Sequence, residues 1–169
     1  MTLLRNQINL KSKNTEPLSS DQAYQYTLRL LTGRDYSTSG ISQKLSAREV
    51  FGQDAEAVIN RLQREGWLND QRYAERFAAS ALSSGRYYGA RLRMEMRRRG
   101  FTADVVNETL APLLAESDEI SEAKSAAERR YPGFSYSTAS DRDKRRVVGF
   151  LQRRGFGFSA IMRALRADD

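Results

Sequence analysis

Residues 86–101 read RYYGARLRMEMRRRGF and combine one apolar helix face with six arginines and a single acid. Tyr88, Leu92 and Met96 recur every four residues, which is the spacing of side chains along one face of an α-helix. Gly100 follows at a position where a glycine commonly ends a helix in the left-handed conformation. The segment therefore predicts an amphipathic helix with its apolar face turned toward a core.

The other face of this helix is strongly basic. A turn of about 100° per residue brings several side chains together away from the apolar stripe, namely Arg91, Arg93, Arg97 and Arg98. Only Glu95 is available as a counter-charge at helical spacing, so we expect these arginines to be nearly unpaired. Two interpretations remain open: a solvated surface, or a binding face for a polyanion or an acidic protein groove, because planar guanidinium groups suit phosphates and carboxylates.

The same pattern returns later in the chain. Residues 98–101, RRGF, reappear as residues 153–156, and the apolar positions around the two copies match at the same offset. Helical periodicity and helix-ending residues predict nine helices in three sets of three, with a looser match in the first set. We therefore expect an all-α fold of three tandem three-helix repeats, each helix-turn-helix-like, in an elongated curved array. The expected units are a mobile N-terminal tail at 1–18 and repeats at 19–69, 70–116 and 117–169.

Local chemistry predicts where individual helices begin and end. N-caps are expected at Ser19, Ser37, Asn69 or Asp70, and Thr102. Pro112 is expected to end the sixth helix or to begin the next segment, because proline has no backbone N–H to donate. Core packing is the interpretation for most aromatic side chains: Tyr36, Trp67, Tyr73, Phe77, Tyr88, Phe101 and Phe156. Tyr87 is freer and could stack on a base.

The repeat offset carries the basic face into the third unit. Arg146 and Arg153 correspond to Arg91 and Arg98, and Arg145 adds to the second group. The two groups would form one basic stripe if successive helices align, or two unrelated solvated faces if they do not. The candidate binding residues are Arg86, Arg91, Arg93, Arg97, Arg98, Arg145, Arg146 and Arg153.

Composition restricts the possible functions. The formal charge is +7, from 28 basic and 21 acidic residues, which favours nucleic acid or an acidic partner. The chain contains no cysteine and no histidine, so disulfides, thiolate chemistry, an imidazole base and a usual zinc site are excluded. We find no phosphate-binding glycine loop, apolar membrane segment or signal peptide, and expect a cytoplasmic protein without a cofactor.

Four motifs follow one another along the chain: RDYS at 34–37 with KL at 44–45, GWLND at 66–70 with YA at 73–74 and Phe77, GARLR at 89–93, and FL at 150–151 with RGF at 154–156. In this order they resemble the motifs of the RecX family of bacterial regulators of the RecA recombinase. The match spans Ala23 to Leu165, and the segment from residue 66 is its most specific part.

The resemblance implies three tandem three-helix repeats and a non-enzymatic role. Such a protein lies in the groove of the RecA filament on DNA and restrains its ATPase, strand-exchange and coprotease activities, within DNA repair, recombination and the SOS response. The partners implied are the RecA filament and single- or double-stranded DNA contacted through phosphates. Neither a membrane nor a small-molecule substrate is expected, and we expect a monomer.

Two other classes of function are compatible with parts of the sequence. A DNA-binding protein of helix-turn-helix type could act without RecA, although its basic faces carry few Asn or Gln side chains for reading bases, so binding would be mostly to phosphates. A magnesium-dependent nuclease is disfavoured, because the acidic residues are scattered with no recurring ligand spacing.

Overall fold

A computed structural model describes residues 18–167, and this part of the chain is built from helices alone, as the sequence predicts. The nine helices are α1 (Ser20–Gly33), α2 (Thr38–Ser46), α3 (Gly52–Arg64), α4 (Asp70–Ser83), α5 (Gly89–Arg98), α6 (Ala103–Glu116), α7 (Glu119–Arg130), α8 (Asp141–Arg154) and α9 (Phe158–Arg166). None of them has the length and the apolar character that a membrane crossing requires.

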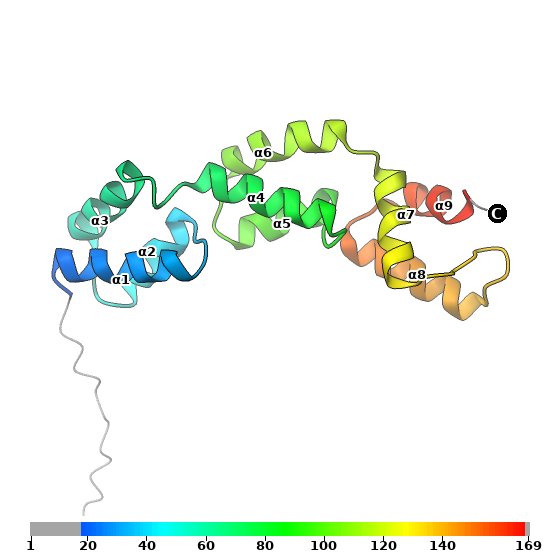
Figure 1. Cartoon of the computed structure of the whole chain (residues 1–169), viewed down its shortest axis with the longest axis horizontal. Helices are drawn as coiled ribbons and strands as arrows, with labels where there is room; N and C mark the ends of the chain where they lie inside the picture. The colour runs from blue at the N-terminus through cyan, green and yellow to red at the C-terminus, as the bar shows by residue number, and fades with distance from the viewer. Residues whose placement is uncertain (1–17, 168–169) are drawn as a thin grey trace, which may run out of the picture.

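The helices pack in three consecutive groups of three. Contacts join α1, α2 and α3, then α4, α5 and α6, and then α7, α8 and α9. Figure 1 shows the groups following one another along an elongated, bowed molecule, which confirms the expected array of tandem repeats. The expected mobile tail, residues 1–18, lies outside the described residues except for its last position.

Most helix starts follow the predicted side-chain chemistry. The hydroxyl of Ser19 accepts from the Gln22 N–H while the Gln22 side chain accepts from the Ser19 N–H, which completes a capping box. The side chains of Asn69 and Thr102 cap α4 and α6 by accepting from the N–H groups of Arg72 and Val105, without the reciprocal bond of a capping box. Local sequence was therefore sufficient to place these ends.

Pro112 departs from its prediction, because it lies inside α6 and the helix continues to Glu116. Proline removes one hydrogen bond, to the carbonyl four residues earlier, here that of Glu108. Both Pro112 and Glu108 are exposed, so water can satisfy the freed carbonyl. The prediction that the helix ends there was wrong because an exposed helix side tolerates this loss.

The buried side chains form two separate cores. The first lies within repeat 1 and includes Ile41, Leu45 and Leu62. The second is continuous through repeats 2 and 3, where the rings of Tyr88 and Phe156 stack with their centroids 4.9 Å apart. Repeats 2 and 3 are thus held together by the burial of apolar surface, which is the dominant favourable contribution to folding.

Repeat 1 joins repeat 2 through polar contacts instead. The Thr38 N–H and hydroxyl both donate to Asp70 Oδ1, at 2.7 and 3.0 Å. Asp35 forms an ion pair with Arg76 of α4. These contacts fix the position of α2 against the second repeat without a shared core.

The middle helices of the three repeats meet end to end. The Tyr88 N–H at the start of α5 donates to the Arg154 carbonyl at the end of α8, at 2.8 Å. One repeat earlier, the Ser37 hydroxyl at the start of α2 donates to the Arg99 carbonyl at the end of α5. The negative carbonyl end of one helix therefore faces the positive N-terminal end of the next, which is favourable for both dipoles.

A glycine lies at each of these joints. Gly100 has φ +86° and Gly155 has φ +103°, the left-handed conformation that L side chains rarely adopt. A Cβ on Gly155 would lie 2.3 Å from the Tyr88 carbonyl oxygen, and one on Gly100 would lie 2.8 Å from the Ser39 Cβ. The close approach of the helices thus depends on the absence of side chains at both positions.

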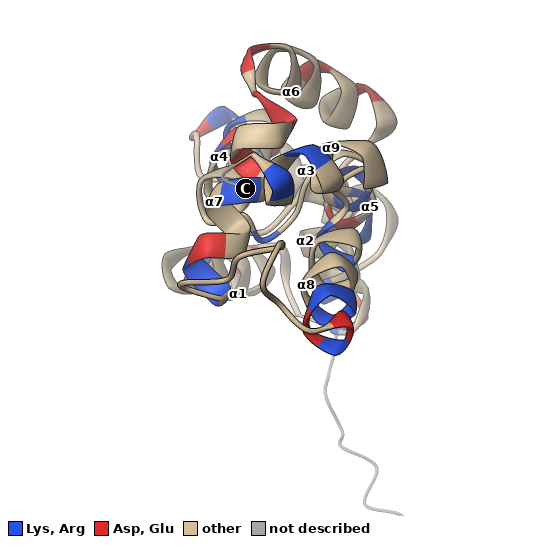
Figure 2. Cartoon of the chain, turned by 90° about the vertical axis from the view of Figure 1, so that its right-hand side faces the viewer, with Lys and Arg blue, Asp and Glu red and all other residues tan. Residues whose placement is uncertain are grey.

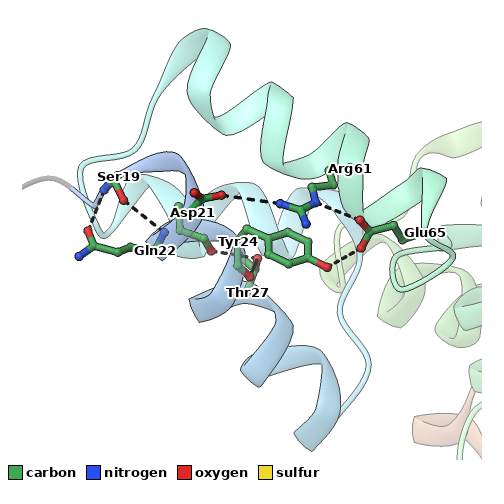
Figure 3. Close-up of polar contacts among 8 residues, drawn as sticks. Ser19, Asp21, Gln22, Tyr24, Thr27, Arg61 and Glu65 are labelled. Atoms are coloured by element: carbon green, nitrogen blue, oxygen red, sulfur yellow. Dashed lines mark hydrogen bonds and ion pairs between the residues drawn. The ribbon is translucent and has the colours of Figure 1, made fainter.

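A polar cluster clamps α1 to α3 in the first repeat (Figure 3). Arg61 Nε donates to Glu65 Oε1 at 2.9 Å, and the guanidinium carbon of Arg61 lies 3.8 Å from the centroid of the Tyr24 ring. The Tyr24 hydroxyl donates to Glu65 Oε2. The hydrogen bonds from Tyr24 and then Arg61 lower the pKa of Glu65.

Replacing Gly155 with alanine tests the end-to-end joint. We expect Gly155→Ala to destabilise the protein by about 1–3 kcal/mol from overpacking, in addition to about 1–2 kcal/mol for the left-handed backbone. Gly66→Ala is the control, because Gly66 has φ +77° and nothing within 4 Å of an added Cβ, so only the backbone cost applies. Urea denaturation, monitored by circular dichroism, measures the free energy of unfolding of both variants. Equal losses of stability would show that the joint accommodates the added methyl group without overpacking.

Acid is expected to weaken the α1–α3 clamp through Glu65. A carboxyl group whose pKa is lowered by folding adds stability above its unfolded pKa, about 4.3 for glutamate, and loses it as the pH falls through the folded value. The thermal midpoint of the wild-type protein should therefore fall more steeply between about pH 5 and pH 3 than that of Glu65→Gln. Glu56→Gln, exposed on the same helix, should keep the wild-type slope. If the thermal midpoints of all three proteins fell equally with pH, the Glu65 carboxylate would not stabilise the contact between α1 and α3.

Candidate functional site

Helix α5 has the two faces expected from its sequence. Tyr88, Leu92 and Met96 are buried in the core shared by repeats 2 and 3. Arg93 and Arg97 are exposed on other sides of the helix. Burial of the apolar stripe thus fixes the rotation of α5 and determines which arginines reach solvent.

Glu95 corrects the expectation that the arginines are nearly unpaired. It is buried, with 5% of its surface exposed, and it engages three guanidinium groups at once. Its carboxylate oxygens lie 2.8 Å from Arg91 Nη2, 3.4 Å from Arg98 Nη1 and 3.4 Å from Arg99 Nη1. One negative charge shared by three positive charges leaves an excess of two, so the cluster stays cationic while its side chains are held in place.

The other arginines of this segment differ in their surroundings. Arg93 donates to the Asn107 side chain on α6 and is thereby tied to its own repeat. Arg97 is exposed and has no ion pair with any residue in the range 18–167. Arg86 is also exposed, in the turn before α5. Arg97 and Arg86 are therefore freer than Arg93 to meet an external anion.

Helix α8 carries the second group of candidates. Arg145, Arg146 and Arg153 are all exposed, and the Arg146 guanidinium lies 5.7 Å from the centroid of the Tyr131 ring. In the view along the molecule, α5 and α8 lie on the same side, with basic segments on both (Figure 2). This common side follows from the end-to-end joint between the two helices.

A groove of about 430 Å³ lies where α5 and α8 meet. It is lined by Ala90, Arg91, Met94, Gln152, Arg153 and Gly155. Arg91 and Arg153, which come from different repeats, thus share one groove, and Met94 leaves 49% of its surface exposed. Arg91 Nε is buried there without a hydrogen-bond partner among the described residues. The joint combines two cations with an apolar thioether.

Three arginines near this joint were missed by the sequence analysis. Arg154 Nη1 donates to the Gly85 carbonyl at 2.9 Å. Arg129 and Arg130 lie in the last turn of α7, and their positive charges act on Arg154 together with that of Arg86. The run of two arginines before Pro132 was visible in the sequence, but its convergence with Arg86 depends on tertiary packing.

The aromatic side chains are mostly placed as expected. Tyr88, Phe101 and Phe156 are buried, but Trp67 is 47% exposed, so its assignment to the core was wrong. Trp67 follows Gly66 in the turn after α3, where Leu68 supplies the buried side chain instead. Tyr87 is half-buried beside Phe77, and its stacking on a base stays a prediction.

Comparison with known families assigns the chain. Three family models match in succession: the RecX first three-helix domain at residues 23–62, the second at 69–110 and the third at 117–165. The chain belongs to the RecX family. The three matched segments correspond to the three packed groups of helices.

Relatives and solved structures agree with this assignment. Regulatory protein RecX from Trichlorobacter lovleyi is 44% identical over 133 residues, covering 79% of this chain and 86% of the relative. Regulatory protein RecX from Thermus thermophilus is 36% identical over 147 residues, covering 86% and 91%. The crystal structure of RecX from Lactobacillus salivarius superposes with a TM-score of 0.69 at 18% identity, over 86% of this chain and 93% of that one. Similarity to RecX regulatory proteins therefore extends through all three repeats.

Removing the charge of Glu95 tests its role in ordering the arginines. Glu95→Gln is expected to destabilise the protein by about 1–3 kcal/mol, because three guanidinium groups lose the one charged acceptor that they have among residues 18–167. Glu108→Gln on α6 removes an exposed carboxylate and should change stability by no more than about 0.5 kcal/mol. Urea denaturation compares the two variants, and equal effects would show that the Glu95 ion pairs contribute nothing to the fold.

Proposed function

We propose that this chain regulates RecA by binding the RecA–DNA filament in its helical groove and restraining its ATPase, strand-exchange and coprotease activities. The observation that carries the proposal is the shared groove at the α5–α8 joint, where Arg91 and Arg153 of successive repeats come together in a chain of the RecX family. The proposal places the protein in the cytoplasm, as a monomer acting in DNA repair, recombination and the SOS response.

The mechanism needs only binding. An elongated array can contact more than one subunit of a filament, and exposed guanidinium groups can reach DNA phosphates between subunits. Such contacts would hold neighbouring subunits together or obstruct filament growth. No catalytic group, cofactor or small-molecule substrate takes part in this mechanism.

The proposed contacts are the eight arginines identified from the sequence, now ranked by their surroundings. Arg97, Arg145 and Arg153 are exposed without an ion pair inside residues 18–167, so they can meet phosphate or carboxylate directly. Arg91 and Arg98 are held by Glu95 and would act as a positioned pair. Arg86 is likewise exposed without an ion pair in that range, and the remaining members, Arg93 and Arg146, contact Asn107 and the Tyr131 ring.

A second candidate function is non-sequence-specific DNA binding without RecA. Arg97, Arg145 and Arg153, exposed and without an ion pair among the described residues, favour it, since they suit phosphates on any sequence. Six phosphate contacts would lose about a thousandfold in affinity between 50 and 200 mM salt. Binding to bare DNA and to RecA-coated DNA at physiological salt separates the two functions. Only the proposal that the protein binds the RecA filament predicts that affinity for RecA-coated DNA is retained.

Charge reversal on both basic helices tests the filament proposal. Arg97→Glu combined with Arg153→Glu should raise the concentration for half-inhibition of RecA strand exchange at least about tenfold, since each charge-assisted hydrogen bond contributes about 1.5–3 kcal/mol. The control, Arg29→Glu combined with Arg64→Glu, reverses two exposed charges in repeat 1 and should leave inhibition within about twofold. Circular dichroism checks that both variants stay helical, and unchanged inhibition by the first variant would rule out these contacts.

A further inference from the structure

Arginines from repeat 3 converge on one glycine of repeat 2. Arg154 Nη1 donates to the Gly85 carbonyl at 2.9 Å, and a Cβ added to Gly85 would lie 2.7 Å from Arg129 Nη2. Arg86 follows Gly85 in the chain, and Arg130 follows Arg129. We call these four arginines, Arg86, Arg129, Arg130 and Arg154, the joint cluster.

Among the described residues, the joint cluster has no counter-charge of its own. Within the part of the chain that the structure describes, none of its four members forms an ion pair, in contrast to the arginines around Glu95. Burial, followed by the like charges of Arg86, Arg129 and Arg130, lowers the pKa of Arg154, against a smaller opposing effect of Tyr87. Four positive charges are therefore held together at an electrostatic cost.

The end of helix α7 explains only part of this arrangement. Cations in the last turn of a helix interact favourably with its dipole, which accounts for Arg129 and Arg130. Arg86 comes from the α4–α5 turn and Arg154 from the end of α8, and neither belongs to α7. The convergence of three separate segments thus requires another explanation.

We propose that the joint cluster is a binding site for phosphate groups that bridges repeats 2 and 3. Arg86, Arg129 and Arg130 are exposed and can approach a ligand, while Arg154 is half-buried and forms the floor of the site. Guanidinium groups bind phosphate through paired hydrogen bonds, and several adjacent forks suit a ligand that carries more than one phosphate. A bound polyanion would neutralise the like charges and fix repeat 3 against repeat 2.

The phosphates can come from a free polyphosphate or from a nucleic-acid backbone, which share the chemistry that the site recognises. The site goes beyond the proposed RecA regulation, because it needs no recombinase and shares only Arg86 with the proposed filament contacts. Evidence against the phosphate site would therefore not contradict the proposed binding to the RecA filament, and evidence against filament binding would not contradict the phosphate site.

Thermal unfolding of the full-length chain tests the site with two probes, sodium tripolyphosphate and an oligo(dT) single strand, each against sodium chloride at equal ionic strength. A bound probe at about a hundredfold excess over its Kd should raise the melting temperature by about 5–10 °C, with saturation. Arg129→Ala combined with Arg130→Ala should abolish the rise. Arg142→Ala combined with Arg163→Ala, which removes two exposed charges elsewhere in repeat 3, should retain it.

The outcomes separate the source of phosphate from the existence of the site. A rise with tripolyphosphate that only the Arg129 and Arg130 variant loses supports a site for free polyphosphate, and a rise with oligo(dT) alone that the same variant loses supports the nucleic-acid backbone. No saturable rise with either probe, or an equal loss in both double variants, would overturn the proposal in favour of general screening by anions.

Discussion

The end-to-end contact between middle helices is the constraint on which the rest of the structure depends. Each joint places a carbonyl at the end of one helix against a donor at the start of another, the Tyr88 N–H in one case and the Ser37 hydroxyl in the other, and glycine at the turn permits the approach. Glu49, which follows α2 at the equivalent position, adopts φ +60° despite its side chain. Glu49 is exposed, and among residues 18–167 no other repeat packs against the end of α2, so the left-handed backbone strain is tolerated there. At Gly100 and Gly155, glycine is thus needed for the close contact between repeats more than for terminating the helix.

The joints also determine how charge is distributed. Because α8 ends against the start of α5, Arg153 comes beside Arg91, and the neighbouring Arg154 turns toward Gly85. The joint between repeats 2 and 3 lies within a continuous apolar core, whereas repeat 1 is attached by hydrogen bonds and the Asp35–Arg76 ion pair. Ion pairs between exposed groups contribute little and weaken with salt. The attachment of repeat 1 is therefore the more sensitive to ionic conditions.

The sequence was sufficient wherever the controlling interactions are local. Caps such as Ser19 and Asn69, and the apolar spacing of Leu92 and Met96, act within one or two helical turns, so the helices and their repetition could be predicted. The predictions for Pro112 and Trp67 failed because solvent exposure, which tertiary packing sets, decided both positions. Helical periodicity also did not reveal that Glu95 is buried and forms ion pairs with three arginines. A single acidic residue in such a pattern is assigned to the polar, solvent-facing side of the helix.

The two arginine clusters differ in what an external anion would have to displace. Around Glu95 an incoming phosphate competes with a buried carboxylate that already accepts from Arg91, Arg98 and Arg99, so part of any gain is lost in breaking existing ion pairs. Around Gly85 the described residues supply no such competitor, and the repulsion acting on Arg154 is already present in the free protein. An anion binding there would relieve this repulsion and would break no ion pair among the described residues. Equal numbers of arginines on a surface therefore do not imply equal affinity for phosphate, because internal neutralisation decides how much of their charge is available.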